Sequence, residues 1–109
     1  MQVLMLVCRD TERAEETGNE PDVEEWVATN DASGRRLAGD ILQPESGAAA
    51  VRVRAGQTLV TDGPFLETKE MLLGFDLLEC KDMAEAVEIA AGHPMAWTSV
   101  IELRPVLEN

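Results

Sequence analysis

The residues best suited to chemistry in this sequence begin with the turn Asp62-Gly63-Pro64-Phe65. Asp bonds its own downstream amides and Pro fixes the backbone, so the turn would hold a carboxylate at one end and an aromatic ring at the other. A fixed carboxylate beside an apolar ring suits a general base or an orienting group. We therefore expect Asp62 to be catalytic and Gly63, Pro64 and Phe65 to contact a substrate. The alternative is a structural corner in which Phe65 fills the core.

His93 is the one histidine in the chain and lies between Gly92 and Pro94. We expect it at the C-terminus of a helix, where exposed carbonyls favour the imidazolium and its pKa would lie near neutrality. It could then act as an acid or a base with Asp62 or Asp76, if the fold brings them together. The alternative is a surface residue that caps the helix.

Other kinds of chemistry find no support in the sequence. It contains no nucleotide-binding glycine motif, no GxSxG and no HExxH. Cys8 and Cys80 lie far apart in apolar stretches, which predicts two small buried side chains, with a disulfide or a reactive thiol as the alternatives. One histidine and two scattered cysteines do not form a zinc set, so we expect no metal and no cofactor.

Length and charge limit the class of protein. The 109 residues carry 9 basic and 21 acidic side chains, a net charge of −12. Nucleic acid and anionic membranes are therefore not expected as partners, because phosphates bind clustered Lys and Arg. The apolar residues 2–8 are far fewer than the roughly 20 of a membrane helix, and no basic leader precedes them. We expect a single domain, residues 1–109, in the reducing cytoplasm.

The hydrophobic pattern predicts the elements that must position these groups. Strands are expected at residues 2–8, 39–44, 72–80 and 98–106, and a hairpin at residues 51–54 and 58–61. A first helix should begin near Asn19. A second helix should be capped by Asp82 and end at Gly92 in a left-handed conformation. Asp76 is the one charged residue on the even-numbered face of strand 72–80.

The order of these elements is strand, helix, strand, hairpin, strand, helix, strand. Two β-α-β halves with antiparallel neighbours predict an α+β fold, a ferredoxin-like sandwich with an added hairpin. The helices of such a fold cover one face of the sheet. Strands 2–8 and 72–80 are mainly apolar on both faces, so we expect a second copy to cover the other face in a homodimer.

The sequence VRVRAGQTLVTDGPFLETKE at residues 51–70, followed by Gly74-Phe75 and by IELRPV at residues 101–106, resembles the YCII-related family and its branch named for the DGPF signature. The resemblance implies a dimeric α+β barrel with a cleft for proton transfer on small organic molecules. In the wider family a His–Asp pair is the proposed catalytic centre, with the His on the first helix. Residues 20–30 contain no histidine, so that pair does not carry over. His93 lies where the wider family tends to place its Asp.

Three functions remain open at this point. The first is a small dimeric enzyme of lyase or isomerase type, with Asp62 and His93 as the acid and base. The second is a non-catalytic dimer that binds a small organic ligand in the same cleft. The third is an accessory protein that acts with a transcription factor, because the resemblance extends to proteins encoded beside sigma factors.

Overall fold

The computed structural model describes residues 1–63 and 71–108, so the predicted site residues Pro64 and Phe65 lie outside the described residues. The strands are β1 (Gln2–Arg9), β2 (Arg36–Ile41), β3 (Ala49–Arg54), β4 (Gln57–Asp62), β5 (Met71–Glu79) and β6 (Val100–Pro105). The helices are α1 (Val23–Ala32), α2 (Met83–Ala91) and the short α3 (Met95–Thr98), with a 3-10 turn at Glu45–Gly47. Within these residues no helix has the length and apolar character needed to cross a membrane.

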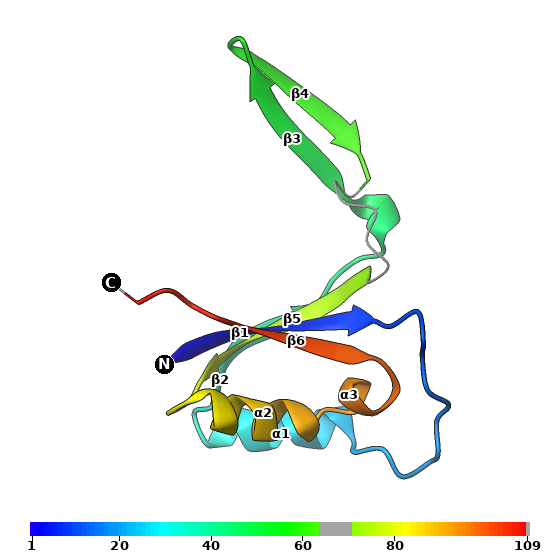
Figure 1. Cartoon of the computed structure of the whole chain (residues 1–109), viewed down its shortest axis with the longest axis vertical. Coiled ribbons are helices and arrows are strands. Elements are labelled where there is room, and N and C mark those ends of the chain that lie inside the picture. Colours follow the sequence, from blue (N-terminus) through cyan, green and yellow to red (C-terminus); the bar gives the residue numbers. More distant parts are fainter. Residues whose placement is uncertain (64–70, 109) are drawn as a thin grey trace.

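Four strands form the main sheet in the order β2-β5-β1-β6, and every neighbouring pair is antiparallel. The helices lie together on one side of this sheet (Figure 1). This arrangement confirms the predicted ferredoxin-like α+β fold. The added hairpin, β3–β4, forms a separate two-stranded sheet. Its turn residues Ala55 and Gly56 both have positive φ, 51° and 77°, as a two-residue hairpin loop of type I′ requires.

The hydrophobic core lies between the sheet and the helices. The odd-numbered residues Val3, Met5 and Val7 of β1 are buried there, because successive side chains of a strand point to opposite faces. Leu78 of β5 lies opposite Val3 and is also fully buried. The helices contribute the remaining buried apolar side chains, Trp26 from α1 and Ala86, Ile89 and Ala90 from α2. Cys8 and Cys80 are both buried and are not joined in a disulfide, as predicted.

The opposite face of the sheet, which we call the outer face, carries the even-numbered residues of β1. Leu4 pairs with Leu77 and Leu6 pairs with Phe75, so these four side chains share this face. All four are only partly buried. No helix of the described residues covers them (Figure 1). Strands β1 and β5 therefore carry apolar side chains on both faces of the sheet, and the helices cover one of these faces, as the sequence predicts.

Three local predictions need correction. The first helix begins after Asp22, whose carboxylate accepts a hydrogen bond from the Glu25 amide, and so it starts later than the predicted Asn19. Strand β2 ends at Ile41, because its ladder with β5 runs from Arg36 to that residue. Gly92 has a φ of −82°, not a left-handed value, since the chain continues in hydrogen-bonded turns from α2 towards α3.

Candidate functional site

A pocket of about 710 Å³ lies on the helical side of the sheet. It is bounded by α1, by β2 and β5, and by the segment that joins α2 to α3. Its walls are mainly apolar, and its polar groups come from α1, β2, β5 and the α2–α3 segment. The lining residues are Val7, Val23, Glu24, Trp26, Val27, Arg36, Gly39, Asp40, Ile41, Leu73, Gly74, Phe75, Asp76, His93, Pro94 and Met95.

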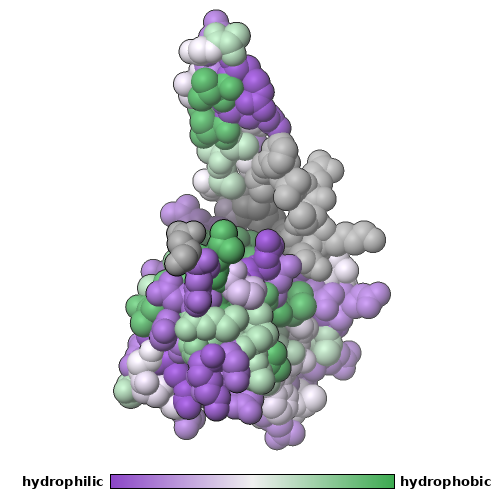
Figure 2. Space-filling model, turned by 60° about the vertical axis from the view of Figure 1, so that its left-hand side comes forward, coloured by the Kyte–Doolittle hydropathy of each residue, from purple (hydrophilic) through white to green (hydrophobic). Residues whose placement is uncertain are grey.

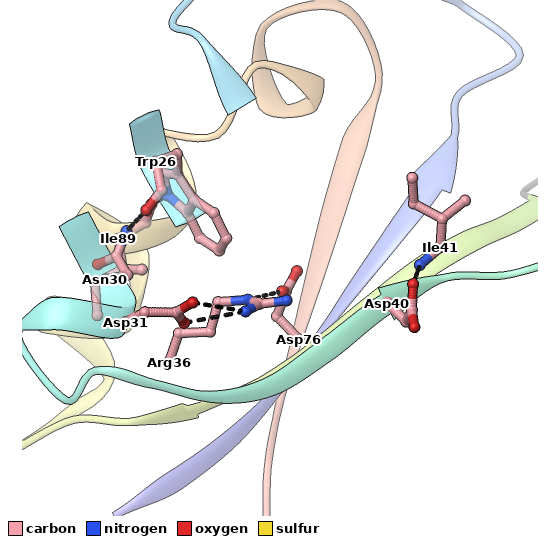
Figure 3. Close-up of polar contacts among 8 residues, drawn as sticks. All are labelled: Trp26, Asn30, Asp31, Arg36, Asp40, Ile41, Asp76 and Ile89. Carbon is pink, nitrogen blue, oxygen red and sulfur yellow. Dashed lines mark hydrogen bonds and ion pairs between the residues drawn. The ribbon is translucent and has the colours of Figure 1, made fainter. Parts of the chain in front are cut away.

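Asp76 brings a carboxylate into this pocket from β5. It lies opposite Met5 in the sheet and therefore points to the helical side, where it is buried. Arg36 of β2 donates from Nε to Asp76 Oδ1 at 2.7 Å, and its Nη1 lies 3.0 Å from Asp31 Oδ1 on α1 (Figure 3). Within the described residues, Oδ2 of Asp76 has no hydrogen-bond partner. One oxygen of the carboxylate is thus fixed by the guanidinium.

Gly39 provides the space that this ion pair occupies. A Cβ at Gly39 would overlap Oδ1 of Asp76 and would lie 2.7 Å from the Phe75 carbonyl oxygen and 2.8 Å from Nη2 of Arg36. Ordinary carbon–oxygen contacts in proteins are longer than 3 Å. Arg36 and Asp76 can therefore meet across β2 and β5 only because position 39 carries no side chain.

His93 reaches the same pocket from the end of α2. It is buried, and its Nδ1 accepts a hydrogen bond from the Met95 amide at 3.1 Å. Because a neutral imidazole that accepts at Nδ1 carries its proton on Nε2, this contact selects the Nε2–H tautomer. His93 therefore offers a hydrogen-bond donor to a ligand.

Trp26 of α1 holds this end of the pocket in place. Its ring meets the His93 ring edge to face, with centroids 4.8 Å apart and an interplanar angle of 76°. Its Nε1 donates to the Ile89 carbonyl of α2 at 2.8 Å (Figure 3). The indole packs against the α2 terminus, where a Cβ on Gly92 would lie 3.4 Å from Trp26 Cδ1, an ordinary van der Waals contact. Trp26 is thus a packing residue that also orients the histidine.

Burial shifts the two titratable groups of the pocket in opposite directions. It raises the pKa of Asp76, and the hydrogen bond and positive charge of Arg36 act against this rise. It lowers the pKa of His93, and the negative charge of Asp76 offsets part of the decrease. The sequence-based expectation of an imidazolium at a helix C-terminus is therefore wrong. Desolvation outweighs the helix-end carbonyls, because the ring is enclosed between α1 and α3.

These groups suit proton transfer at a carbon next to a carbonyl. A carboxylate with a raised pKa is a stronger base than a solvated one. A neutral imidazole that donates from Nε2 can polarise a carbonyl oxygen without first losing a proton. Among the residues that the structure describes, no three His, Cys, Asp or Glu side chains gather closely enough to hold a metal ion.

The predicted site residues fall in two different places. His93 lines the pocket together with Asp76. The sequence offers Asp62 and Asp76 as carboxylate partners of this histidine, and the structure brings Asp76 to it. Asp62 lies at the end of β4 on the hairpin, where it pairs with Ala49, and is not a lining residue. Gly63 follows it with a φ of 90°, and its amide donates to the Ala48 carbonyl. In the described residues nothing brings Asp62 to His93, and its catalytic role stays a prediction.

Arg36 and Gly39 are the functional residues that sequence reasoning missed. Both lie at or before the start of the predicted strand 39–44, so their alignment with Asp76 in the neighbouring strand was not foreseen. The sequence does indicate that Asp76 has a partner, because a single carboxylate on an apolar strand face needs a cationic partner or a function.

The family model described as YCII-related domain matches residues 1–109. A curated protein of Rhizobium meliloti (strain 1021), named only as uncharacterized, is 46% identical over 67 residues. That match covers 60% of this chain and 54% of the relative, so the chain spans about half the length of the curated relative it matches.

Proposed function

This chain belongs to the YCII-related domain family, and from that premise we propose that it is an enzyme that moves a proton on a small organic molecule. Asp76 is the general base, and His93 is the hydrogen-bond donor that stabilises the charge formed. The observation that carries the proposal is the meeting of these two buried groups in one mainly apolar pocket. Buried titratable groups with opposed pKa shifts are a common mark of catalytic sites.

The reaction starts with a substrate carbonyl whose oxygen accepts a hydrogen bond from Nε2–H of His93. Oδ2 of Asp76 removes the proton from the neighbouring carbon, and the electron pair of the C–H bond moves onto the oxygen as an enolate. In an isomerase, Asp76 returns the proton to a different atom of the substrate. In a lyase, the enolate oxygen re-forms the carbonyl, and the electron pair of the enolate double bond moves to the bond between the α- and β-carbons. The leaving group departs from the β-carbon with its bonding electron pair. Arg36 fixes the Asp76 carboxylate throughout, and it is a positioning residue.

The pocket indicates the class of substrate. Trp26, Val27 and Met95 supply apolar walls, so the substrate would carry an aliphatic or aromatic portion beside its carbonyl. Glu24 adds negative charge to the lining, which disfavours a dianion. A neutral ketone, lactone or hydroxyketone fits this combination of groups.

The proposal includes a homodimer formed through the outer face of the sheet. Leu4, Leu6, Phe75 and Leu77 support it, because they form an apolar surface with no covering element in the described residues. If this face offers roughly 600–800 Å² of apolar surface, its burial contributes about 15–20 kcal/mol before the costs of association. Sedimentation of Leu77→Lys tests this part, since a lysine at the centre of the interface should give monomers while leaving the pocket unchanged.

The catalytic proposal is tested by exchange of carbon-bound protons into D₂O. The wild-type protein is incubated with a panel of small ketones, lactones and hydroxyketones, and loss of the α-proton signal is followed by NMR. We expect exchange for at least one compound, a loss of about 100-fold or more in Asp76→Asn, and a smaller loss in His93→Gln, because general bases contribute 10²–10⁴-fold.

Asp62→Asn in the same assay separates the two candidate carboxylates. Asp76 as the base predicts that this variant keeps its exchange rate. Exchange lost in Asp62→Asn and retained in Asp76→Asn would transfer the role to the hairpin carboxylate and overturn our assignment. A compound that shifts the thermal midpoint through the pocket but never exchanges its protons would contradict catalysis and favour a non-catalytic binding protein.

A further inference from the structure

The hairpin β3–β4 extends away from the rest of the chain. It rises on the side of the main sheet opposite to the helices (Figure 1). The radius of gyration is 16.1 Å, whereas a compact domain of this length would have about 13 Å. Among residues 1–63 and 71–108, the strands of the hairpin pair only with each other. A two-stranded hairpin without a further layer is at best marginally stable in water, so this element needs support from outside its own sheet.

The two faces of the hairpin differ in character. Val51 lies opposite Val60, and Val53 lies opposite Thr58, so the three valines share one face, which we call the valine face. These valines are 63%, 63% and 58% exposed for Val51, Val60 and Val53. The other face carries Arg52 opposite Leu59. Figure 2 shows the apolar side chains gathered on one side of the hairpin and the polar ones on the other.

The charge of the hairpin also differs from that of the rest of the chain. Residues 49–62 contain two arginines and one aspartate, whereas the remaining residues contain seven basic and twenty acidic side chains. A weakly positive arm is thus attached to a strongly acidic body. Arg52 and Arg54 lie on the face opposite to the valine face, so they do not contact the surface against which the valines would pack. The positive charge of the arm instead lowers the long-range electrostatic repulsion between the arm and a second copy of this acidic chain.

We propose that the hairpin is an arm that packs its valine face against the second copy in the homodimer. This inference rests on the proposed homodimer and names the segment that completes it. A copy docked on the outer face would approach from the side on which the hairpin rises (Figure 1). If the outer face offers roughly 600–800 Å² per copy, two copies bury about 1,200–1,600 Å², which is the lower part of the range for a standard interface. Two arms, exchanged across a twofold axis, enlarge it with apolar surface.

A matched pair of variants on β4 tests the arm. Val60→Thr replaces a methyl by a hydroxyl on the valine face, and Leu59→Thr changes the neighbouring residue on the opposite face. Threonine keeps the strand preference at both sites. Because each dimer contains two arms, Val60→Thr should raise the dimer dissociation constant about tenfold or more in sedimentation. Leu59→Thr should change it less than threefold, and equal effects of the two variants would overturn the proposal.

Isotope-filtered NMR on a mixture of ¹³C-labelled and unlabelled chains provides the direct readout. We expect NOEs from the methyl groups of Val51, Val53 and Val60 to protons of the other chain. A dimer in which these methyls show contacts only within their own chain would overturn the arm and leave the sheet-face dimer intact. A stable particle of about 12 kDa in sedimentation would overturn the dimer and the arm together. The proton-exchange assay reports separately on the catalytic proposal.

Discussion

Gly39→Ala tests the construction of the pocket, because one added methyl group must displace the ion pair that fixes Asp76. The new Cβ would overlap Asp76 Oδ1 and would lie 2.7 Å from the carbonyl oxygen of Phe75. The Asp76 and Arg36 side chains can rotate away, but the Phe75 oxygen belongs to the backbone of β5. The variant therefore has to break the Arg36–Asp76 hydrogen bond and shift the two strands apart.

The expected cost follows from these two events. A hydrogen bond to a charged group contributes about 1.5–3 kcal/mol, and overpacking of a well-packed site costs about 1–3 kcal/mol. Replacing a strand glycine by alanine returns about 0.5–1 kcal/mol of conformational entropy. We expect Gly39→Ala to lower the free energy of unfolding by about 2–4 kcal/mol, measured by urea titration with tryptophan fluorescence.

Gly47→Ala is the matched control for this measurement. The three atoms nearest to its Cβ all belong to the Gln43 side chain, the closest at 2.8 Å, and that flexible side chain can move away. The control should change stability by less than about 0.5 kcal/mol. Equal stabilities of the two variants would refute the claim that Gly39 makes room for the ion pair.

Three further predictions concern single side chains. Burial lowers the pKa of His93 below its ordinary value of 6.5. The wild-type protein should therefore be more stable than His93→Gln above pH 6.5 and lose this advantage as the pH falls through the lowered pKa, by at most about 1.4 kcal/mol per pH unit. A stability difference that does not depend on pH would contradict this. Asp82→Ala should cost about 1 kcal/mol in urea unfolding, because the Asp82 carboxylate caps α2 at the Glu85 amide, and an unchanged midpoint would show that the cap contributes nothing. Met5→Ala should cost about 2–5 kcal/mol, since its side chain is fully buried, and a loss below 1 kcal/mol would place Met5 outside the core.

Local patterns in the sequence were sufficient for the fold. The alternation of Val51-Arg52-Val53-Arg54 located the hairpin, and the Asp82 cap located the start of α2, as observed. The even-numbered face of strand 72–80 placed Asp76 among apolar residues, as β5 does. These signals are short-range, so a single sequence contains them in full. Their agreement explains why the order of elements and the ferredoxin-like class were predictable.

The site depended on pairings that short-range patterns do not contain. Arg36 meets Asp76 across two strands that are 40 residues apart in the chain, and that contact depends on a strand register unknown from sequence. The pKa of His93 was expected near neutrality from its position after a helix, but enclosure by Trp26 and α3 lowers it. The turn motif at Asp62 predicts a catalytic carboxylate, but Asp62 lies at the end of β4 in the hairpin and does not line the pocket.

The most direct test of the proposed site is ¹⁵N NMR of the His93 ring. The chain contains one histidine, so the signals are assigned without ambiguity. We predict a neutral imidazole at pH 7 with the proton on Nε2, a pKa below 6.5, and a further decrease of this pKa in Asp76→Asn, because the negative charge that partly supports protonation is removed. An imidazolium at pH 7, a proton on Nδ1, or a titration unaffected by Asp76→Asn would contradict the account.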